Sequence, residues 1–372
     1  AYIEASRQTA IPKVSVSRPR IYLDHAATTP VLPQARAAMV EALERWANPS
    51  SPHGEGRAAK AALERARGEI AEALGWKHDI LFTSGASEAV AIVAARAVPH
   101  RRLVGATEHD VVPHYMGEGA TVLPVDAAGV IDTDALAKAL ADASALVAIQ
   151  QVNNETGVIQ PMEALADRIR AAGGLLLADC AQSAGKIDLP DADFIAISAH
   201  KFGGPPGIGA LLVRDLSTLA PSGGQEKGYR RGTQNLPAVA GMAAALVSGA
   251  HRESMPRLAA QKDRMEAGVR AAGGVIISEG SERLPAISAI ALEGASKDGL
   301  LVQLDLAGFA VSAGSACSSG KMKASRVLAA MGVPASIANG ALRMSFGPQT
   351  SDEDFTAFVA AFTAIAERRR AA

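Results

Sequence analysis

The chain has 372 residues, of which 48% are hydrophobic and 20% are charged, and its formal net charge is −1 at pH 7. This balance is typical of a folded globular protein and argues against a disordered chain or one that binds nucleic acid. No apolar run approaches the ~20 residues that span a bilayer, and the first twenty residues lack the apolar core of a secretory signal. The length favours two domains over one.

Helical periodicity dominates the first 75 residues. The apolar positions predict one helix over residues 33–46 and a second over residues 55–74, which ends at Gly75. Each helix carries an apolar stripe: Met39, Leu43 and Trp46 in the first, and Leu63, Ile70 and Leu74 in the second.

From residue 79 onward, short apolar runs alternate with helical or loop segments. These runs are residues 79–84, 102–107, 145–150, 174–179, 193–198 and 208–213. Because Gly and polar residues bound them, they are typical of strands buried on both faces. Strands that alternate with helices predict an α/β domain with a mostly parallel sheet.

The pattern changes near residue 250. A long helix over residues 255–273 is followed by more widely separated apolar runs, and the C-terminus is helical. This predicts a smaller α+β domain. We expect a large domain over residues 31–249 and a small domain formed by residues 1–30 and 250–372.

The polar residues directly after the apolar runs are the candidates for function, because ligands of open α/β sheets bind beyond the carboxyl ends of the strands. Lys201 lies between such a run and a loop rich in Gly and Pro, with His200 beside it. An amine in this place suits a Schiff base. Asp179 follows four apolar residues, and its carboxylate needs a cationic partner such as a protonated ring nitrogen, unless it merely caps a loop.

Further candidates follow other runs. The small-residue turn over residues 84–87 either cradles a phosphate at a helix N-terminus or is an ordinary cap made by Ser84 or Ser87. Arg343, inside an apolar strand, binds either a substrate carboxylate or an internal acid. His109, Asn153, Asn154 and Glu155 also lie at run ends, where they act on a substrate or build turns.

The two cysteines, Cys180 and Cys317, form no CxxC pair. This argues against a disulfide framework and a thiolate zinc site, and predicts a reducing compartment, the cytoplasm. Cys317 stands in "FAVSAGSACSSGKMKAS", residues 309–325. A structural cysteine packs among bulky apolar neighbours, whereas Gly, Ala and Ser favour an exposed loop. The pattern therefore indicates a displayed thiol.

Together these residues describe a pyridoxal-phosphate enzyme that acts on an amino acid. The set comprises a lysine for the Schiff base, a carboxylate for a ring nitrogen, a phosphate cradle and an arginine for a carboxylate.

The chain resembles the cysteine desulfurases of the class V aminotransferase family, within the fold-type I pyridoxal-phosphate enzymes. The resemblance runs in order over about residues 22–347. It is carried by "YLDHAATTP", "NPSSPHGEGR", "FTSGASEA", "TEHDVV", "VNNETGV", "ADCAQSAGK", "SAHKFGGPPGIG", "YRRGTQN", "SAGSACSSG" and "LRMSFG". It implies pyridoxal 5'-phosphate as the cofactor and L-cysteine as the substrate.

The resemblance also implies a role for each candidate. Lys201 would hold the cofactor and move protons, Asp179 would pair with the ring nitrogen, and Gln182 would bind the phenolic oxygen. His109 would stack on the ring, and Asn154 and Arg343 would bind the substrate carboxylate. The cofactor phosphate would be held by Ala86, Ser87, Ser198 and His200, and by Thr233 of the neighbouring subunit, which implies a homodimer.

Cys317 acquires a role from the same resemblance. As a thiolate it would attack the sulfur of L-cysteine, so that L-alanine leaves and a persulfide remains on the enzyme. Lys321 and Lys323 either favour this thiolate or only solvate the loop. The persulfide would pass to a protein acceptor, such as a scaffold for iron–sulfur clusters, because the long loop resembles that branch of the family. Cys180 stands where the family usually has a small residue, and we expect it to be buried.

Two other interpretations stay open at this point. A selenocysteine lyase or an aminotransferase would use the same scaffold, because a fold does not determine a function. A non-catalytic α/β protein that binds a nucleotide or a partner would have no use for Lys201, Asp179 and Cys317 together.

Overall fold

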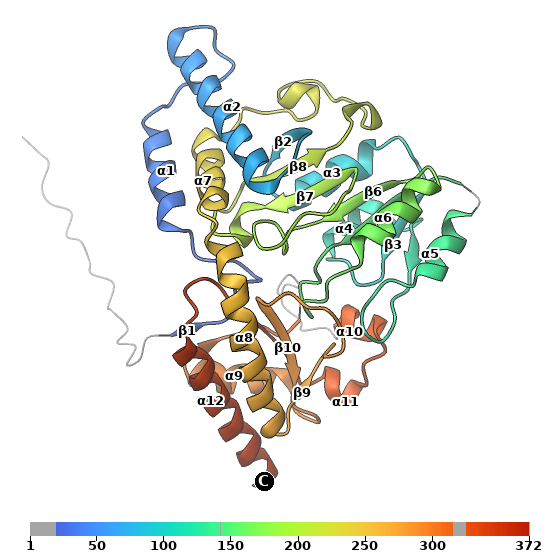
Figure 1. Cartoon of the computed structure of the whole chain (residues 1–372), viewed down its shortest axis with the longest axis vertical. Coiled ribbons are helices and arrows are strands. Elements are labelled where there is room, and N and C mark those ends of the chain that lie inside the picture. Colours follow the sequence, from blue (N-terminus) through green and yellow to red (C-terminus); the bar gives the residue numbers. More distant parts are fainter. Residues whose placement is uncertain (1–19, 142, 315–324, 372) are drawn as a thin grey trace, which may run out of the picture.

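The computed structural model of the chain describes residues 20–141, 143–314 and 325–371, so Cys317, Lys321 and Lys323 lie outside the described residues. Figure 1 shows an upper body built around a large sheet and a lower body built around a small one. The long helix α8 (Ala250–Ala271) extends from the middle of the molecule into the lower body (Figure 1). The architecture is α/β, as the sequence predicts.

The large sheet has seven strands in the order β2–β8–β7–β6–β5–β3–β4. Their bounds are β2 Asp79–Thr83, β3 Arg102–Gly105, β4 Thr121–Leu123, β5 Leu146–Gln150, β6 Leu175–Asp179, β7 Phe194–Ser198 and β8 Gly209–Val213. The ladders from β4 through β3, β5 and β6 to β7 are parallel, whereas β8 is antiparallel to both of its neighbours. The prediction of a mostly parallel sheet is confirmed.

Each of the six apolar runs forms one of these strands, and every residue of β5, β7 and β8 is buried. Continuous burial explains why these strands show no polar alternation. The sequence prediction missed β4, because this edge strand has three residues and two of them are exposed.

Helices cover both faces of this sheet and surround the lower body. They are α1 Pro33–Leu43, α2 Gly54–Leu74, α3 Ala86–Arg96, α4 Val111–Met116, α5 Thr133–Leu140, α6 Met162–Ala171, α7 Leu236–Val247, α9 Lys297–Leu306, α10 Arg326–Ala330, α11 Ala335–Ala338 and α12 Asp352–Ala371. Short 3₁₀ turns are η1 Ala199–Lys201, η2 Leu216–Thr218 and η3 Glu226–Gly228. Of the helices described, none combines the length and apolar composition that crossing a bilayer requires.

The lower body contains a three-stranded antiparallel sheet in the order β12–β10–β9 and a two-stranded parallel pair of β1 with β11. Their bounds are β1 Ile21–Tyr22, β9 Val275–Ile276, β10 Ile287–Ala291, β11 Phe309–Ala310 and β12 Ala341–Ser345. Buried phenylalanines of α12 join this core, so the N-terminal strand and the C-terminal helix share it. The domain bounds at 30/31 and 249/250 stay a prediction.

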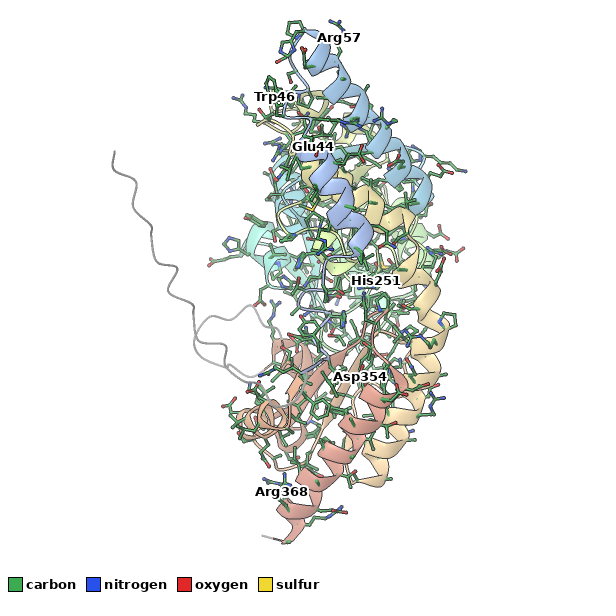
Figure 2. All side chains as sticks on the ribbon, turned by 90° about the vertical axis from the view of Figure 1, so that its left-hand side faces the viewer. Glu44, Trp46, Arg57, His251, Asp354 and Arg368 are labelled. Atoms are coloured by element: carbon green, nitrogen blue, oxygen red, sulfur yellow. The ribbon has the colours of Figure 1, made fainter. Side chains whose placement is uncertain are left out.

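The predicted second helix is confirmed: it ends at Leu74, and Gly75 adopts the left-handed conformation with a φ of 64°. The first helix differs from its prediction. It ends at Leu43, before Trp46, and these two side chains are 62% and 81% exposed. Small residues decide this outcome, because α1 buries Ala35 and Ala42 and packs closely against α7. Figure 2 shows Trp46 near the upper edge of the molecule.

A buried carboxylate joins three segments of the upper body. The side chain of Glu226 is fully buried, and its Oε2 accepts hydrogen bonds from the Phe82 main-chain N–H at 2.8 Å and from Arg67 Nη1 at 2.9 Å. Its Oε1 accepts from Gln234 Nε2 at 2.8 Å. This one side chain therefore joins α2 and β2 to the segment after β8.

Breaking this pair should destabilise the protein strongly. We expect Glu226→Ala to lower the free energy of unfolding by roughly 3–5 kcal/mol, because Arg67 would lose its buried partner. The Phe82 N–H and Gln234 Nε2 would also lose their acceptor. Glu64 is a matched control, since it pairs with the same arginine but is exposed. Glu64→Ala should cost less than about 1 kcal/mol. Urea unfolding measures the free energy of unfolding of both variants. An equal decrease in the two would contradict the prediction.

Candidate active site

A cavity of about 360 Å³ lies at the carboxyl ends of β5, β6 and β7. This is the edge of the sheet at which α/β proteins bind their ligands. Most of the predicted site residues line this cavity, although they come from distant parts of the chain: Ala86, Ser87, His109, Asn154, Asp179, Gln182, Ser198, His200, Lys201 and Arg343.

Lys201 ends the turn η1 directly after β7. Its Nζ donates hydrogen bonds to the main-chain oxygens of Ala26 at 2.6 Å and Ala27 at 2.8 Å. The loop that follows must turn sharply. Gly203 has a φ of 86°, and a Cβ built on it would lie 2.5 Å from Leu32. The Gly and Pro residues that follow the lysine therefore serve a close turn around the cavity.

Asp179 and His109 are polar residues of the cavity lining. Asp179 ends β6, is buried, and accepts the N–H of Ala181 on Oδ1 at 2.9 Å. Burial raises the pKa of the Asp179 carboxyl, and the charges of His109 and Lys201 oppose that rise. A cationic group that enters the cavity would favour the carboxylate further. His109 Nδ1 accepts the N–H of Val111 at 3.3 Å.

Gln182 carries an unsatisfied polar atom. Its Nε2 donates to the Ala26 main-chain oxygen at 2.9 Å, whereas Oε1 is buried and has no hydrogen-bond partner among the described residues. An orphaned buried acceptor costs free energy unless a ligand satisfies it. This side chain is therefore placed to meet a polar group in the cavity.

The start of α3 offers an anion site. Its N-cap is Gly85, and no side chain caps this helix. The interpretation of this turn as a cap made by Ser84 or Ser87 is therefore wrong. Glu88 accepts the N–H of Ser84, and a Cβ built on Gly85 would lie 3.5 Å from Ser198 Oγ. Main-chain N–H groups and hydroxyls thus meet at the positive end of a helix.

His200 borders the same region. Its Nδ1 lies 3.2 Å from Thr28 Oγ1. Burial, aided by the charges of Lys201 and Lys186, lowers the pKa of His200 to about 4. The imidazole is therefore neutral at pH 7 and acts as a hydrogen-bonding group rather than as a cation.

Arg343 lies on β12, and its side chain is buried between both bodies. Its Nη2 contacts Asp24 Oδ1 at 2.7 Å, and its Nη1 donates to the Asn154 main-chain oxygen at 3.0 Å. The internal salt bridge considered in the sequence analysis is therefore present. The Nε has no partner among the described residues, and Arg343 still lines the cavity.

A second cavity of about 260 Å³ adjoins the first and shares His109, Asn154 and Arg343 with it. Glu108 and Glu155 line it. Burial raises the pKa of both carboxyls, that of Glu108 strongly. Sequence reasoning missed Glu108. Its position directly before His109, just after an apolar run, is the feature that could have identified it. It named Glu155 without a role, and here Glu155 accepts the Ser325 hydroxyl at 2.6 Å.

Two candidates that the structure describes line neither cavity: Thr233 is exposed, and Asn153 builds a turn by accepting the N–H groups of Glu155 and Thr156 on its Oδ1. Cys317 lies outside the described residues. Lys186 was missed as well. It is buried near Lys201, four positions after Gln182, and nothing in the local sequence pattern separates it from a surface lysine.

A family model for class V aminotransferases matches residues 21–358. The chain belongs to the class V aminotransferase family. Its members depend on pyridoxal phosphate, and the chain's curated relatives are named cysteine desulfurases. The chain is 38% identical to a cysteine desulfurase of Cereibacter sphaeroides over 378 residues, which cover 95% of this chain and 97% of the relative.

Two further relatives agree. An IscS-like cysteine desulfurase of Mycobacterium tuberculosis is 37% identical, with 94% of this chain and 98% of the relative covered. A solved structure of a NifS-like protein from Rickettsia africae matches with a TM-score of 0.84 at 30% identity, and the match covers 94% of this chain and 99% of that one. These matches confirm the predicted family and the fold-type I architecture.

Cys180 is buried, as expected, next to Asp179. Burial raises the pKa of its thiol, and its Sγ lies 3.4 Å from Gln151 Oε1. We expect the peptide that contains Cys180 to stay unmodified by iodoacetamide at pH 8 until the protein is unfolded, because the thiolate is the reactive form. Mass spectrometry of the digested protein measures this. Rapid labelling of Cys180 in the folded protein would contradict its burial.

Proposed function

We propose that this chain is a pyridoxal-phosphate-dependent cysteine desulfurase that takes sulfur from L-cysteine and holds it as a persulfide on Cys317. The observation that carries the proposal is the single cavity in which Lys201, Asp179, Gln182 and the uncapped start of α3 converge. The relatives named cysteine desulfurase support the same activity over almost the full chain.

The residues present fit the cofactor. The uncapped N-terminus of α3, with Ser87 and Ser198, suits a phosphate, and the orphaned Gln182 Oε1 is an acceptor that a ring hydroxyl would satisfy by donating to it. Asp179 is a buried carboxyl whose raised pKa a ring cation would lower. Lys201 supplies the amine. Bound pyridoxal phosphate would serve as an electron sink for bond cleavage at the substrate's α and β carbons.

The chain's own groups then bind, orient and move protons. Asp179 would keep the ring nitrogen of a bound cofactor protonated, and His109, in the loop after β3, would stack on that ring. Lys201 moves a proton through its Nζ, which the Ala26 and Ala27 oxygens aim into the cavity. Arg343 and Asn154 stand where both cavities meet, and the Arg343 guanidinium attracts the substrate carboxylate in competition with Asp24.

Cys317 is the proposed sulfur nucleophile. Its thiolate attacks the sulfur of the bound L-cysteine, so that a sulfur–sulfur bond forms while the carbon–sulfur bond breaks. The carbon takes up a proton, and L-alanine leaves. The persulfide then passes to a protein thiol, for which a scaffold of iron–sulfur cluster assembly is the expected acceptor. We expect this chemistry in the reducing cytoplasm.

Sulfide release from L-cysteine under a reductant tests the nucleophile. We expect Cys317→Ala to lower release to background while the absorbance of bound pyridoxal phosphate stays, because the thiol acts on sulfur and does not hold the cofactor. Cys180→Ala is the matched control, since it removes the other thiol, and should keep most of the activity. Equal release by wild type and Cys317→Ala would instead support a lyase of the selenocysteine type.

A homodimer is part of the proposal. Thr233 is exposed and does not line the cavity of its own chain, in keeping with a role at the phosphate of a neighbouring subunit. Leu43 and Trp46 expose a large apolar area at the end of α1 that a second copy would cover.

Sedimentation velocity should therefore give twice the mass of one chain. The double variant Leu43→Asp/Trp46→Asp should sediment as a single chain, because it places two carboxylates in an apolar contact. Leu306→Asp is the control: Leu306 is 82% exposed on α9, so a charge there should leave the dimer intact. A monomeric wild type, or equal dissociation in both variants, would contradict this interface.

A further inference from the structure

A second lysine is buried beside Lys201. Lys186 is 5% exposed, and its Nζ donates a hydrogen bond to the main-chain oxygen of Gln182 at 2.9 Å. No carboxylate within the described ranges lies at ion-pair distance from it. A buried lysine without an acidic partner is costly and is unusual in a protein core.

The hydrogen bonds lead from Lys186 to the catalytic lysine in three steps. Lys186 holds the main-chain oxygen of Gln182, and the Gln182 side chain donates to the oxygen of Ala26 at 2.9 Å. The same Ala26 oxygen accepts Lys201 Nζ at 2.6 Å. Movement of the turn after β6 would therefore shift both the Gln182 amide and the oxygen that aims Lys201.

The titratable groups that interact with Lys186 in the described part of the chain are all basic residues. Lys201 and His200 face it from η1, His25 from the segment after β1, and His251 from the start of α8. Figure 2 places His251 near the junction of the two bodies. Burial and the Lys201 charge lower the pKa of Lys186 to about 7. Burial also lowers the pKa of His25 and His251, so these rings are neutral at pH 7.

We propose that Lys186 is a positioning residue of the cofactor site, which orients Gln182 and Lys201 through the Gln182 turn and adds a buried positive charge that favours an anionic cofactor. The proposal rests on the proposed binding of pyridoxal phosphate. It deepens that proposal by adding a residue that acts on the site indirectly, since Lys186 does not line the cavity.

A second buried lysine supplies the control. Lys262 is also 5% exposed, donates to a main-chain oxygen, that of Leu284, and has a pKa lowered to about 8 mainly by burial. It lies in α8, within the lower body, and lines neither cavity. Lys262→Met thus reproduces the loss of a buried lysine without touching the Gln182 turn.

The experiment measures the dissociation constant of pyridoxal phosphate by absorbance titration of the apoprotein at pH 6 and pH 8.5. We expect Lys186→Met to bind about 10- to 100-fold more weakly at pH 6, as for the loss of a charged hydrogen bond. Lys186 is charged below pH 7 and largely neutral above it. The ratio of the two dissociation constants should therefore be severalfold smaller at pH 8.5. Lys262→Met should match wild type at both values.

Two more variants separate charge from folding. Lys186→Gln keeps a hydrogen-bond donor but no charge, so its affinity for pyridoxal phosphate should lose the part of the pH dependence that Lys186 supplies. This variant keeps the test valid if Lys186→Met folds poorly. Lys186→Arg keeps both the donor and the charge and should regain affinity in part. The inference would be overturned if Lys186→Met and Lys186→Gln bound pyridoxal phosphate with wild-type affinity. It would also be overturned if their loss of affinity did not change with pH and equalled that of Lys262→Met. Either result would leave the proposed function intact. A wild type that takes up no pyridoxal phosphate would overturn the proposed function and this inference with it.

Discussion

Two side chains donate to a single main-chain oxygen, that of Ala26, and the geometry of the site depends on it. Lys201 reaches it from the end of β7 and Gln182 from the turn after β6. Ala26 itself belongs to the segment that follows β1, whose N–H at Ala26 donates to Ser345 Oγ on β12. The segment after β1 thus joins the large sheet to the small one beside the cavity.

This arrangement explains why the cavity lies between the two bodies. Parallel strands β5, β6 and β7 end at one edge and deliver Gln150, Asp179 and Ser198 there. The small sheet contributes Arg343 from β12, and the ion pair with Asp24 holds it against the same edge. Neither body has all the predicted site groups by itself, so the cavity that they line forms only when the two bodies pack together.

Charge is distributed unevenly around the cavity. Lys201 lines it and Lys186 is buried beside it, while the buried carboxyls are Asp179 in the lining and Glu108 in the adjoining cavity, and burial raises the pKa of both carboxyls. Such a site is costly when it holds no ligand, because each charged form is separated from water. A ligand that carries both an anionic group and a cationic ring would offset this cost, so the binding of such a ligand would stabilise the fold around the site.

Much of the fold was predictable from local pattern. The six buried strands have apolar runs with polar ends, and Gly75 ends α2 in the conformation that glycine favours. Local pattern failed for α1, where Leu43 and Trp46 lie on the outside although their spacing predicts a buried stripe. Helix periodicity shows which residues share a face, but the neighbouring element decides which face is buried. Here α7 packs against the face of α1 that contains Ala35 and Ala42.

The sequence by itself determined the family and the α/β class, and it predicted the chemistry of the site, because Lys201, Asp179, His109 and Arg343 each stand in short motifs at strand ends. Only the tertiary structure decided which of these side chains share a cavity, that Arg343 pairs with Asp24, that no side chain caps α3, and that Lys186 is buried beside Lys201. The physical reason is that burial and hydrogen bonding arise between segments distant in the chain, and a residue's charge state follows from those contacts.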